Sequence, residues 1–411
     1  MIGIPEPVES LHTVTVIGAG LIGTSIALAL SGQGVAVHLQ DVRRESLRIA
    51  EAMGAGTARA PGRPTDLAVL AVPPHQVYTA VAEAQRRGIA RHYTDVASVK
   101  AALAGGGADV EASLFIGGHP IAGRELHGPG AAREDLFRGK PWILTPSAST
   151  SAQTARAALL LVELCGGHAV TMEAEAHDRA IAVTSHLPHL VSAVTARMLR
   201  SCDSKTLGLC GSGLRDFTRI AAGDAELWTD ILGSNASAVL DALDILVEDL
   251  GLVRRSLSAL AGRAPDGPAD EGAAYRELLR HLLDQGRAGQ ALIPQKYGAQ
   301  GRSYQDVRVP LADQEGELAR LLADVSRRGV NVEDLRIEES PASPTGIAVL
   351  SVQASAADPL GDWLRVRRGW PVLRDHPTPP PAPAPGASSP ASPGASPAPG
   401  AEKPEPVRTA S

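Results

Sequence analysis

Apolar residues recur along the chain with a spacing that changes twice, and each change marks a different kind of structure. From residue 12 to about residue 170, short runs rich in β-branched residues alternate with helical patterns. The runs that we predict to be strands are 13–17, 35–40, 67–72, 93–96, 115–117, 142–145 and 169–171. Strands separated by helices indicate a mostly parallel α/β sheet, so we expect an α/β domain at residues 11–173.

The middle of the chain follows a helical period instead. Helices are predicted at 179–200, at 227–251 with continuation to 260, and at 273–285. Few runs between them have the alternation of a strand, so we expect an α-helical domain at residues 174–300. The segment 261–272 is rich in Pro, Gly and Asp and predicts a loop between two of these helices.

After a break at 297–304 the pattern becomes that of a small α+β module, expected at residues 304–375. It predicts strands at 306–309, 332–338 and 346–352 and helices at 316–328 and 357–367. From residue 377 onward the chain carries 12 of its 31 prolines and almost no large apolar side chain. Such a segment cannot bury enough surface to offset its ordering entropy, so residues 376–411 are predicted to be a disordered Pro/Ala/Ser-rich tail.

Composition and charge exclude several classes of protein. The 39 Lys and Arg residues against 45 Asp and Glu give a net charge of −6, which is not the basic footprint of a nucleic-acid-binding protein. Apolar stretches such as 67–72 are much shorter than the roughly 20 residues that span a bilayer, and the N-terminus lacks a signal-peptide pattern. Three cysteines without CxxC spacing argue against a disulfide framework or a structural zinc site. We therefore expect a cytoplasmic protein that binds neither nucleic acid nor membrane.

A glycine motif between the first strand and an apolar helix predicts a Rossmann-type dinucleotide-binding domain. In this motif the first glycine permits a tight turn, the second lets the backbone approach a pyrophosphate, and the third allows close helix packing. Asp41 ends the next strand, where a carboxylate can bind both ribose hydroxyls of NAD, although Arg43 and Arg44 could instead receive the 2′-phosphate of NADP. The alternative is a glycine turn that only packs a helix on a sheet. The cofactor-binding residues that we predict are Gly18, Ala19, Gly20, Leu21, Ile22, Gly23, Asp41 and Val72.

Two polar residues follow later strands, at the sheet edge where doubly wound folds bind ligands. Ser98 could orient a substrate hydroxyl or a catalytic base, or it could cap a helix that starts at Val99. His119 precedes Pro120, which disfavours helical geometry and predicts a loop position for it. Imidazole titrates near neutral pH, so His119 is a candidate general base, and the glycines around it would let a substrate approach. The alternative is an ordinary surface histidine.

The helical part supplies further imidazoles and guanidiniums. His186 and His189 share one helical face if the helix runs through Pro188, but no further ligand lies within reach in this helix, so we predict no metal site. Arg215 and Arg219 lie four residues apart on one face, and either could hold the carboxylate of an acidic substrate. The alternative for both arginines is a surface ion pair with Asp216 or Asp224.

Five motifs together closely resemble, in order and spacing, the prephenate/arogenate dehydrogenase family of tyrosine biosynthesis. They are GAGLIGTS, DVASVK, GGHPIAG, HD followed by TSHLPH, and GSGLRDFTR, within residues 13–260. The resemblance implies a Rossmann domain and a helical dimerisation domain, and hence a homodimer. It also implies NAD-dependent oxidative decarboxylation of prephenate to 4-hydroxyphenylpyruvate.

The resemblance assigns roles to individual residues. It implies that His119 hydrogen-bonds the ring hydroxyl of the substrate, that Ser98 supports His119, and that Arg219 holds a substrate carboxylate. As hydride leaves the ring carbon, His119 would accept the hydroxyl proton, and loss of CO2 would make the ring aromatic. Residues that the resemblance places in or near the same cleft are Asp178, Ser185, His186, His189 and Trp228. Ser212 and Arg215 depart from the residues that many relatives carry, but Arg215 stays a candidate for the substrate carboxylate.

The C-terminal module resembles an ACT regulatory domain. The resemblance rests on an acidic turn and helix at 311–319 and on a second strand at 329–334. ACT domains pair and bind amino acids, which implies tyrosine as a feedback effector. The alternative is a small module that only aids dimerisation.

Three other functions remain open from the residues. The same enzyme could act on arogenate, which carries an amino group in place of the side-chain ketone. A β-hydroxy-acid dehydrogenase would need a catalytic lysine in the helical domain, where Lys205 is the only lysine between Cys165 and Leu260. The third possibility is a non-catalytic NAD-binding protein whose ACT-like module senses an amino acid.

Overall fold

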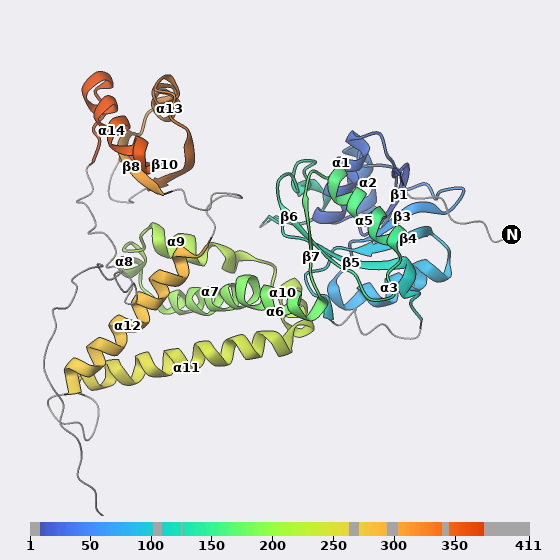
Figure 1. The fold of residues 1–411 in the computed structure, drawn as a ribbon, viewed down its shortest axis with the longest axis horizontal. Coiled ribbons are helices and arrows are strands. Elements are labelled where there is room, and N and C mark those ends of the chain that lie inside the picture. Colours follow the sequence, from blue (N-terminus) through green and yellow to red (C-terminus); the bar gives the residue numbers. More distant parts are fainter. Residues whose placement is uncertain are drawn as a thin grey trace, which may run out of the picture. The chain divides into compact units, whose positions relative to one another are not determined.

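The structure is a computed structural model that describes residues 9–101, 109–124, 126–262, 271–293, 303–338 and 345–373 (Figure 1). The described residues before residue 301 form one compact unit, and those after it form a second. Most of the loop predicted at 261–272 and the whole tail predicted at 376–411 lie outside the described residues.

The first unit begins with a seven-stranded sheet. Its strands lie in the order β2-β1-β3-β4-β5-β6-β7, and neighbouring strands from β2 to β5 pair in parallel. The β5–β6 pair is antiparallel, and β6 and β7 are again parallel to each other. The mostly parallel sheet that the sequence predicts is therefore confirmed. The strands are β1 (Thr13–Ile17), β2 (Ala36–Gln40), β3 (Thr65–Leu70), β4 (Ala90–Asp95), β5 (Phe115–Pro120), β6 (Pro141–Thr145) and β7 (His168–Thr171).

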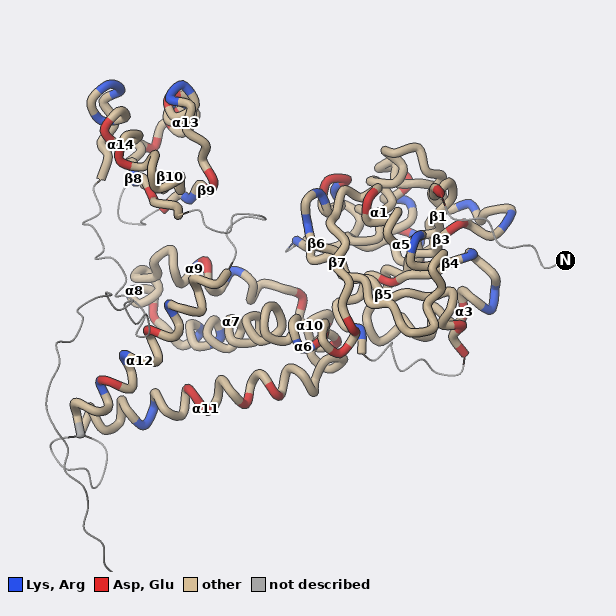
Figure 2. The backbone as a smooth tube through the Cα atoms, in the orientation of Figure 1, with Lys and Arg blue, Asp and Glu red and all other residues tan. Residues whose placement is uncertain are grey.

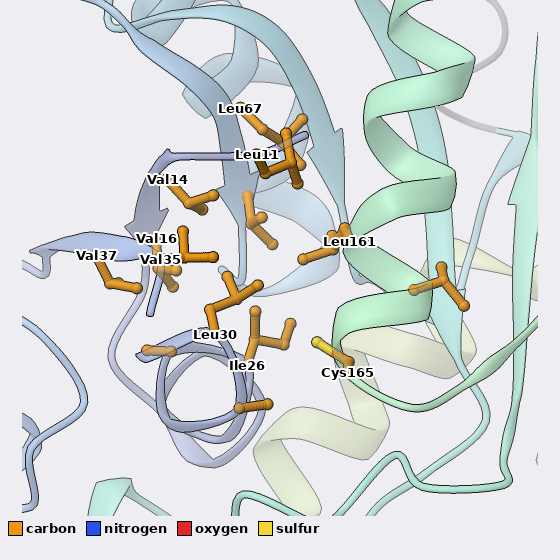
Figure 3. Packing of buried hydrophobic residues seen from close by; sticks show 14 of the residues in the cluster. Leu11, Val14, Val16, Ile26, Leu30, Val35, Val37, Leu67, Leu161 and Cys165 are labelled. Atoms are coloured by element: carbon orange, nitrogen blue, oxygen red, sulfur yellow. The ribbon is translucent and has the colours of Figure 1, made fainter. Parts of the chain in front are cut away.

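Helices cover both faces of this sheet because its strands are apolar on both sides. Along β3, Leu67 and Val69 join the core beneath α1 and α5, whereas Ala68 and Leu70 join the core beneath α3. Figure 3 shows the first of these cores, in which Leu161 of α5 packs near Ile26 and the strand residues. The helices are α1 (Leu21–Gly32), α2 (Arg44–Ala52), α3 (Pro74–Arg86) and α5 (Ala152–Leu164).

The rest of the first unit is helical, as predicted, but its helices are interrupted at two places that matter for the site. A π-helical turn, Ala182–His186, lies between α6 and α7. The prediction of one continuous helix from 227 to 260 is wrong, because the helix breaks at Asn235, between α10 and α11. The helices are α6 (Ala174–Ile181), α7 (Leu187–Met198), α8 (Ser204–Leu207), α9 (Ser212–Arg219), α10 (Ala225–Ser234), α11 (Ala236–Leu260) and α12 (Glu271–Ala291).

The second unit contains the strands and helices that its sequence pattern predicts. They are β8 (Tyr304–Ala312), α13 (Glu317–Arg327), β9 (Val332–Glu338), β10 (Thr345–Gln353) and α14 (Ala354–Arg368). The strands form an antiparallel sheet in the order β8-β10-β9, and Leu373 bridges to Arg308 of β8.

A buried carboxylate, Asp324, lies where the helices of this unit meet. It is 2% exposed and accepts hydrogen bonds from Arg368, from Trp370 Nε1 at 2.9 Å and from Arg327 at 2.6 Å. The Arg368 guanidinium, followed by Trp370 and Arg327, lowers the pKa of Asp324 to about 2. The charge on Asp324 is therefore part of what holds α13 to α14.

Candidate active site

Each of the three glycines in the motif occupies its position for a different structural reason. Gly18 has φ +105°, and a Cβ there would lie 2.2 Å from the carbonyl oxygen of Ala71. A Cβ on Gly23 would lie 1.9 Å from the carbonyl oxygen of Gly18. A Cβ on Gly20 would meet nothing within 4 Å, so the backbone at Gly20 faces open space at the N-terminus of α1. Two glycines allow the close packing, and the third leaves room at a helix end that favours a phosphate.

Asp41 is directed at this loop. Its Oδ2 accepts a hydrogen bond from the backbone N–H of Ala19 at 2.7 Å, and its Oδ1 accepts one from the backbone N–H of Arg43 at 2.7 Å. Ala19, Leu21 and Ile22 lie between the glycines, and Val72 lies just past the end of β3, beside Gly18. These residues present a glycine loop, a helix N-terminus and a carboxylate together, which is the donor and acceptor set that fits NAD.

The loop after β4 is held by a buried ion pair between Lys100 and Asp95. The two side chains are 1% and 0% exposed. Asp95 also accepts hydrogen bonds from the backbone N–H of Gly118 at 3.0 Å and of Ala97 at 3.1 Å. Burial lowers the pKa of Lys100, and the adjacent Asp95 opposes that shift. The pair therefore fixes this loop against β5.

Ser98 lies in the same loop, and its alternative role as a helix cap is wrong. Val99 and Lys100 are not helical, and the N–H groups of Lys100 and Ala101 donate to the carboxylate of Asp178, at 2.8 and 2.7 Å. The buried Ser98 hydroxyl has no hydrogen-bond partner among the described residues. A buried hydroxyl without a partner is costly, so Ser98 is suited to bind a ligand group.

His119 lies within strand β5 and not in a loop, so that prediction is wrong. It pairs with Ile143 of β6, which is possible because the extended geometry that Pro120 favours is also that of a strand. The interpretation of the two glycines before His119 is also wrong, whereas a Cβ on Gly123 would meet nothing within 4 Å. A Cβ on Gly117 would lie 2.4 Å from Thr145 Oγ1, and one on Gly118 would lie 2.6 Å from the carbonyl oxygen of Asp95. These glycines let β5 pack against protein, not against a substrate.

A line of three side chains joins the sheet to α6. The Nδ1 of His119 lies 2.9 Å from Nε2 of His177, and Nδ1 of His177 lies 2.7 Å from Oδ1 of Asp178. His177 is 0% exposed and Asp178 is 3% exposed. Burial disfavours a charge on Asp178, but hydrogen bonds from His177, Ala101 and Lys100 outweigh it and lower its pKa. Asp178 is thus a carboxylate at neutral pH.

The electrostatics around His119 favour its neutral form. Burial, followed by the positive charge of Lys100 and by His177 and His186, holds the pKa of His119 well below its ordinary value. A neutral imidazole can accept a proton, so His119 is in the state that a general base requires.

The remaining aromatic and imidazole residues form a second cluster. The rings of His189 and Trp228 stack with centroids 3.5 Å apart, and His186 meets Trp228 edge-on at 6.1 Å. The prediction that His186 and His189 share one face is confirmed, because the helix continues through Pro188 at the start of α7. Burial lowers the pKa of His186 to about 4 and also lowers that of His189.

Asn235 connects the two clusters. Its Nδ2 donates to the backbone carbonyl of Asp178 at 2.9 Å and lies 3.1 Å from Nδ1 of His186. The break between α10 and α11 places Asn235 at this point. Ser185 is half-buried in the π-helical turn beside His186. π-helical turns within α-helices often mark functional positions.

The structure does not bring every predicted residue into this line of contacts. Arg215 and Arg219 are exposed on α9, which packs against α7, the helix that carries His189. Neither arginine takes part in the hydrogen bonds that join His119, His177 and Asp178.

Three site residues were missed from the sequence: His177, Lys100 and Asn235. His177 belongs to the HD motif and Lys100 to the DVASVK motif, so their closeness in sequence to Asp178 and Ser98 could have indicated that they are site residues. For Asn235 the available signal was the run Gly233-Ser234-Asn235, which is typical of a helix end, although the apolar period continues across it. Within the described ranges, no group of three or more His, Cys, Asp or Glu could hold a metal ion. In the same ranges no helix has both the length and the apolar character that crossing a bilayer requires.

Fold and site together define a Rossmann-type dinucleotide-binding protein with a second, helical domain, an arrangement found in many dehydrogenases. Comparisons with known proteins narrow this class. The family model "Prephenate dehydrogenase, nucleotide-binding domain" matches residues 26–171, and "Prephenate dehydrogenase, dimerization domain" matches residues 173–263. The chain belongs to the prephenate dehydrogenase family and is an NAD-dependent oxidoreductase.

Individual relatives agree with this family. "Probable prephenate dehydrogenase NovF" of Streptomyces niveus is 41% identical over 368 residues, covering 88% of this chain and 99% of the relative. Cyclohexadienyl dehydrogenase of Zymomonas mobilis is 33% identical over 264 residues, covering 61% of this chain and 89% of the relative.

Two solved structures share the fold at 26% identity. Prephenate dehydrogenase from A. aeolicus, in complex with hydroxyphenyl propionate and NAD+, has a TM-score of 0.59 and covers 69% of this chain and 99% of its own. Synechocystis arogenate dehydrogenase has a TM-score of 0.55 and covers 68% of this chain and 99% of its own.

Proposed function

We propose that the chain catalyses the oxidative decarboxylation of prephenate to 4-hydroxyphenylpyruvate in tyrosine biosynthesis. The observation that carries this proposal is His119, a neutral imidazole at the ligand-binding edge of the sheet and in contact with a buried carboxylate through His177. The names of the relatives support the substrate.

The residues of the chain divide the work as follows. Gly18, Gly20, Gly23, Asp41 and the N-terminus of α1 would hold NAD, which supplies a hydride acceptor when bound.

On the substrate side, His119 accepts the proton of the ring hydroxyl, and Ser98 offers its unpaired hydroxyl to the same group. Arg219, with Arg215 on the same helix face, binds a substrate carboxylate. Ser185, His189 and Trp228 are the further residues that would contact the substrate, and aromatisation on loss of CO2 drives the reaction forward.

Arogenate is the second candidate substrate. The similarity to Synechocystis arogenate dehydrogenase and to a cyclohexadienyl dehydrogenase supports arogenate as a candidate substrate. The experiment is to follow NADH formation by purified protein with prephenate and arogenate separately, and with NAD and NADP, beside a His119→Asn variant. Turnover of prephenate that collapses in the variant supports the proposal, whereas turnover of arogenate alone changes the substrate but keeps the mechanism. NAD binding without turnover of either would favour the non-catalytic sensor.

The proposed domain boundaries follow the predictions: 11–173 for NAD, 174–300 for substrate and dimerisation, and 304–375 for an ACT-like regulatory domain. In the domain proposed at 304–375, the described elements follow the order strand, helix, strand, strand, helix. Leu373 adds a bridge at the free edge of β8, as in split βαβ modules. This topology supports an ACT-like module, and tyrosine is the proposed effector because it is the end product of the proposed pathway. The proposal for this domain fails if saturating tyrosine changes neither the rate nor KM.

A homodimer is the proposed assembly. Four exposed leucine and valine side chains share one face of α11: Leu240, Val247, Leu250 and Leu257. Figure 2 shows that the acidic positions of α11 are spaced along the helix. Exposed apolar faces of this kind mark interaction sites, and the matched family model is a dimerisation domain. Sedimentation equilibrium of the full chain should give a dimer, and a Leu250→Lys variant should weaken it.

A further inference from the structure

The catalytic histidine that we propose does not stand alone, because its second nitrogen is bonded within the protein. The Nδ1 of His119 lies 2.9 Å from Nε2 of His177, with the two rings edge-on at 77° and centroids 5.1 Å apart. Only Nε2 of His119 is then left to meet a substrate. Which of its nitrogens carries the proton therefore decides whether His119 is a base or a donor.

The hydrogen-bond chain determines that proton position from its far end. An ionised carboxylate accepts hydrogen bonds and cannot donate them, so Nδ1 of His177 carries the proton that faces Asp178. A neutral His177 then presents a bare Nε2, and Nδ1 of His119 must donate to it. The consequence is a bare Nε2 on His119.

We propose that His177, held by Asp178, is a positioning residue that fixes the tautomer of His119 so that its Nε2 is the proton acceptor. This inference deepens the proposed function and rests on it. When His119 takes the hydroxyl proton at Nε2, the positive charge on its ring is stabilised through Nδ1–H by His177 and the Asp178 carboxylate. No further acceptor or donor is needed.

The surroundings make this arrangement rigid before any substrate arrives. The carboxylate of Asp178 is fixed by the N–H groups of Lys100 and Ala101, and its backbone carbonyl accepts from Asn235. His177 is fully buried, so no water competes for its nitrogens.

The charged and titratable groups that act on His119 are few. They are Lys100, whose charge is paired with Asp95, together with His177 and His186. Of these groups, His177 is the one that accepts from the Nδ1 of His119.

The test compares two substitutions of His177 with a matched control. His177→Leu removes both hydrogen bonds, whereas His177→Gln keeps one donor and one acceptor on its end group, as imidazole does. The control is His92→Leu, which removes another buried sheet histidine whose hydrogen bond, to Thr154, lies outside the site.

We expect His177→Leu to lower kcat by about 100-fold or more with KM changed less than about threefold, since a general base contributes about 10²–10⁴. His177→Gln should recover at least about tenfold of that loss, and His92→Leu should stay within about twofold of the wild type. A fall in kcat that is equal in His177→Leu and His177→Gln would overturn the positioning role, and so would an unchanged kcat in His177→Leu.

A spectroscopic measurement tests the tautomer without turnover. The full chain is labelled with ¹⁵N-histidine, and the His119 signals are assigned by their loss in His119→Asn. The expected wild-type signature is a protonated Nδ1 and a bare Nε2, with a shift toward protonated Nε2 in His177→Leu. Protonated Nε2 in the wild type, or a tautomer that ignores His177→Leu, would overturn the inference.

The two proposals fail in different ways. A wild type that turns over neither prephenate nor arogenate refutes the proposed function, whatever the tautomer. A wild type that is active, with His177→Leu equally active, refutes only the inference. If His177→Leu does not fold, His177→Gln and the wild-type tautomer still decide.

Discussion

The buried ion pair between Lys100 and Asp95 provides a quantitative test of how the loop after β4 is held. In Lys100→Met, the Asp95 carboxylate would stay at 0% exposure without its cation. Among the described residues, its remaining donors would be the N–H groups of Ala97 and Gly118. Removing one partner of a buried ion pair costs about 3–5 kcal/mol, and the two remaining donors place our expectation near the lower end, about 3 kcal/mol.

The double variant separates the pair from its surroundings. In Lys100→Met with Asp95→Asn neither member of the pair carries a charge, and the new amide oxygen can still accept from Gly118. The cost of the double variant should therefore be smaller than the sum of the two single costs. We expect a coupling energy of about 2 kcal/mol, within the range found for side chains in direct contact.

The assay is urea unfolding of the full chain, followed by circular dichroism and by loss of NAD binding, which reports on the first unit alone. The same variants should lower kcat, because Ser98 lies in the loop that the pair holds. The reasoning is refuted if Lys100→Met unfolds within about 1 kcal/mol of the wild type, or if the two single costs simply add.

Three further outcomes are expected. His186 is 1% exposed, and its burial lowers its pKa to about 4, so the folded state disfavours its protonation. The contribution of His186 to the unfolding free energy is therefore complete above pH 6.5 and falls by up to about 3 kcal/mol as the pH drops toward 4. Unfolding midpoints of His186→Phe should lack that part of the pH dependence, and equal slopes in variant and wild type would contradict the assignment. Burial raises the pKa of Cys165 to about 12, so a thiol reagent at neutral pH should modify Cys202 and Cys210 in the native protein but Cys165 only after denaturation. Asp324→Asn should lower the unfolding free energy of the second unit by about 1–2 kcal/mol, because the amide keeps one acceptor and the partners Arg368 and Arg327 are partly exposed. The loss should appear as faster hydrogen exchange in β8 and β10, and unchanged exchange would show that the carboxylate charge is dispensable.

Much of the fold could be predicted because it follows local periodicity. The β-branched runs of β1 and β3, the glycine loop and Asp41 occur in chain order, and their spacing is that of a βαβ unit. The helix break at Asn235 could not be predicted in this way. Gly233 and Asn235 are residues that often end helices, but the apolar period continues across them, and the side-chain bond of Asn235 reaches residue 178, far away in the sequence.

The site was predicted less completely, for a related reason. Ser98 and His119 were predicted because strand ends converge at one edge of a parallel sheet: Ser98 follows β4, and His119 lies near the end of β5. His177 was missed because its partner lies 58 residues away, on a different domain, and no periodicity connects a strand with a distant helix. The glycines before His119 were misinterpreted because a glycine that makes room for a ligand and one that makes room for protein look the same in sequence.

One carboxylate joins two features that the sequence presents separately. Asp178 accepts from the N–H groups of Lys100 and Ala101, and so ties the loop of Ser98 to α6. The same carboxylate orients His177 toward His119. In the proposed arrangement, the Asp178 carboxylate thus determines two things. It holds the sheet to the helical domain, and it determines which nitrogen of His119 carries the proton. A change that loosens that contact would also release the tautomer of His119, so loss of interdomain contact and loss of the proton acceptor should occur together.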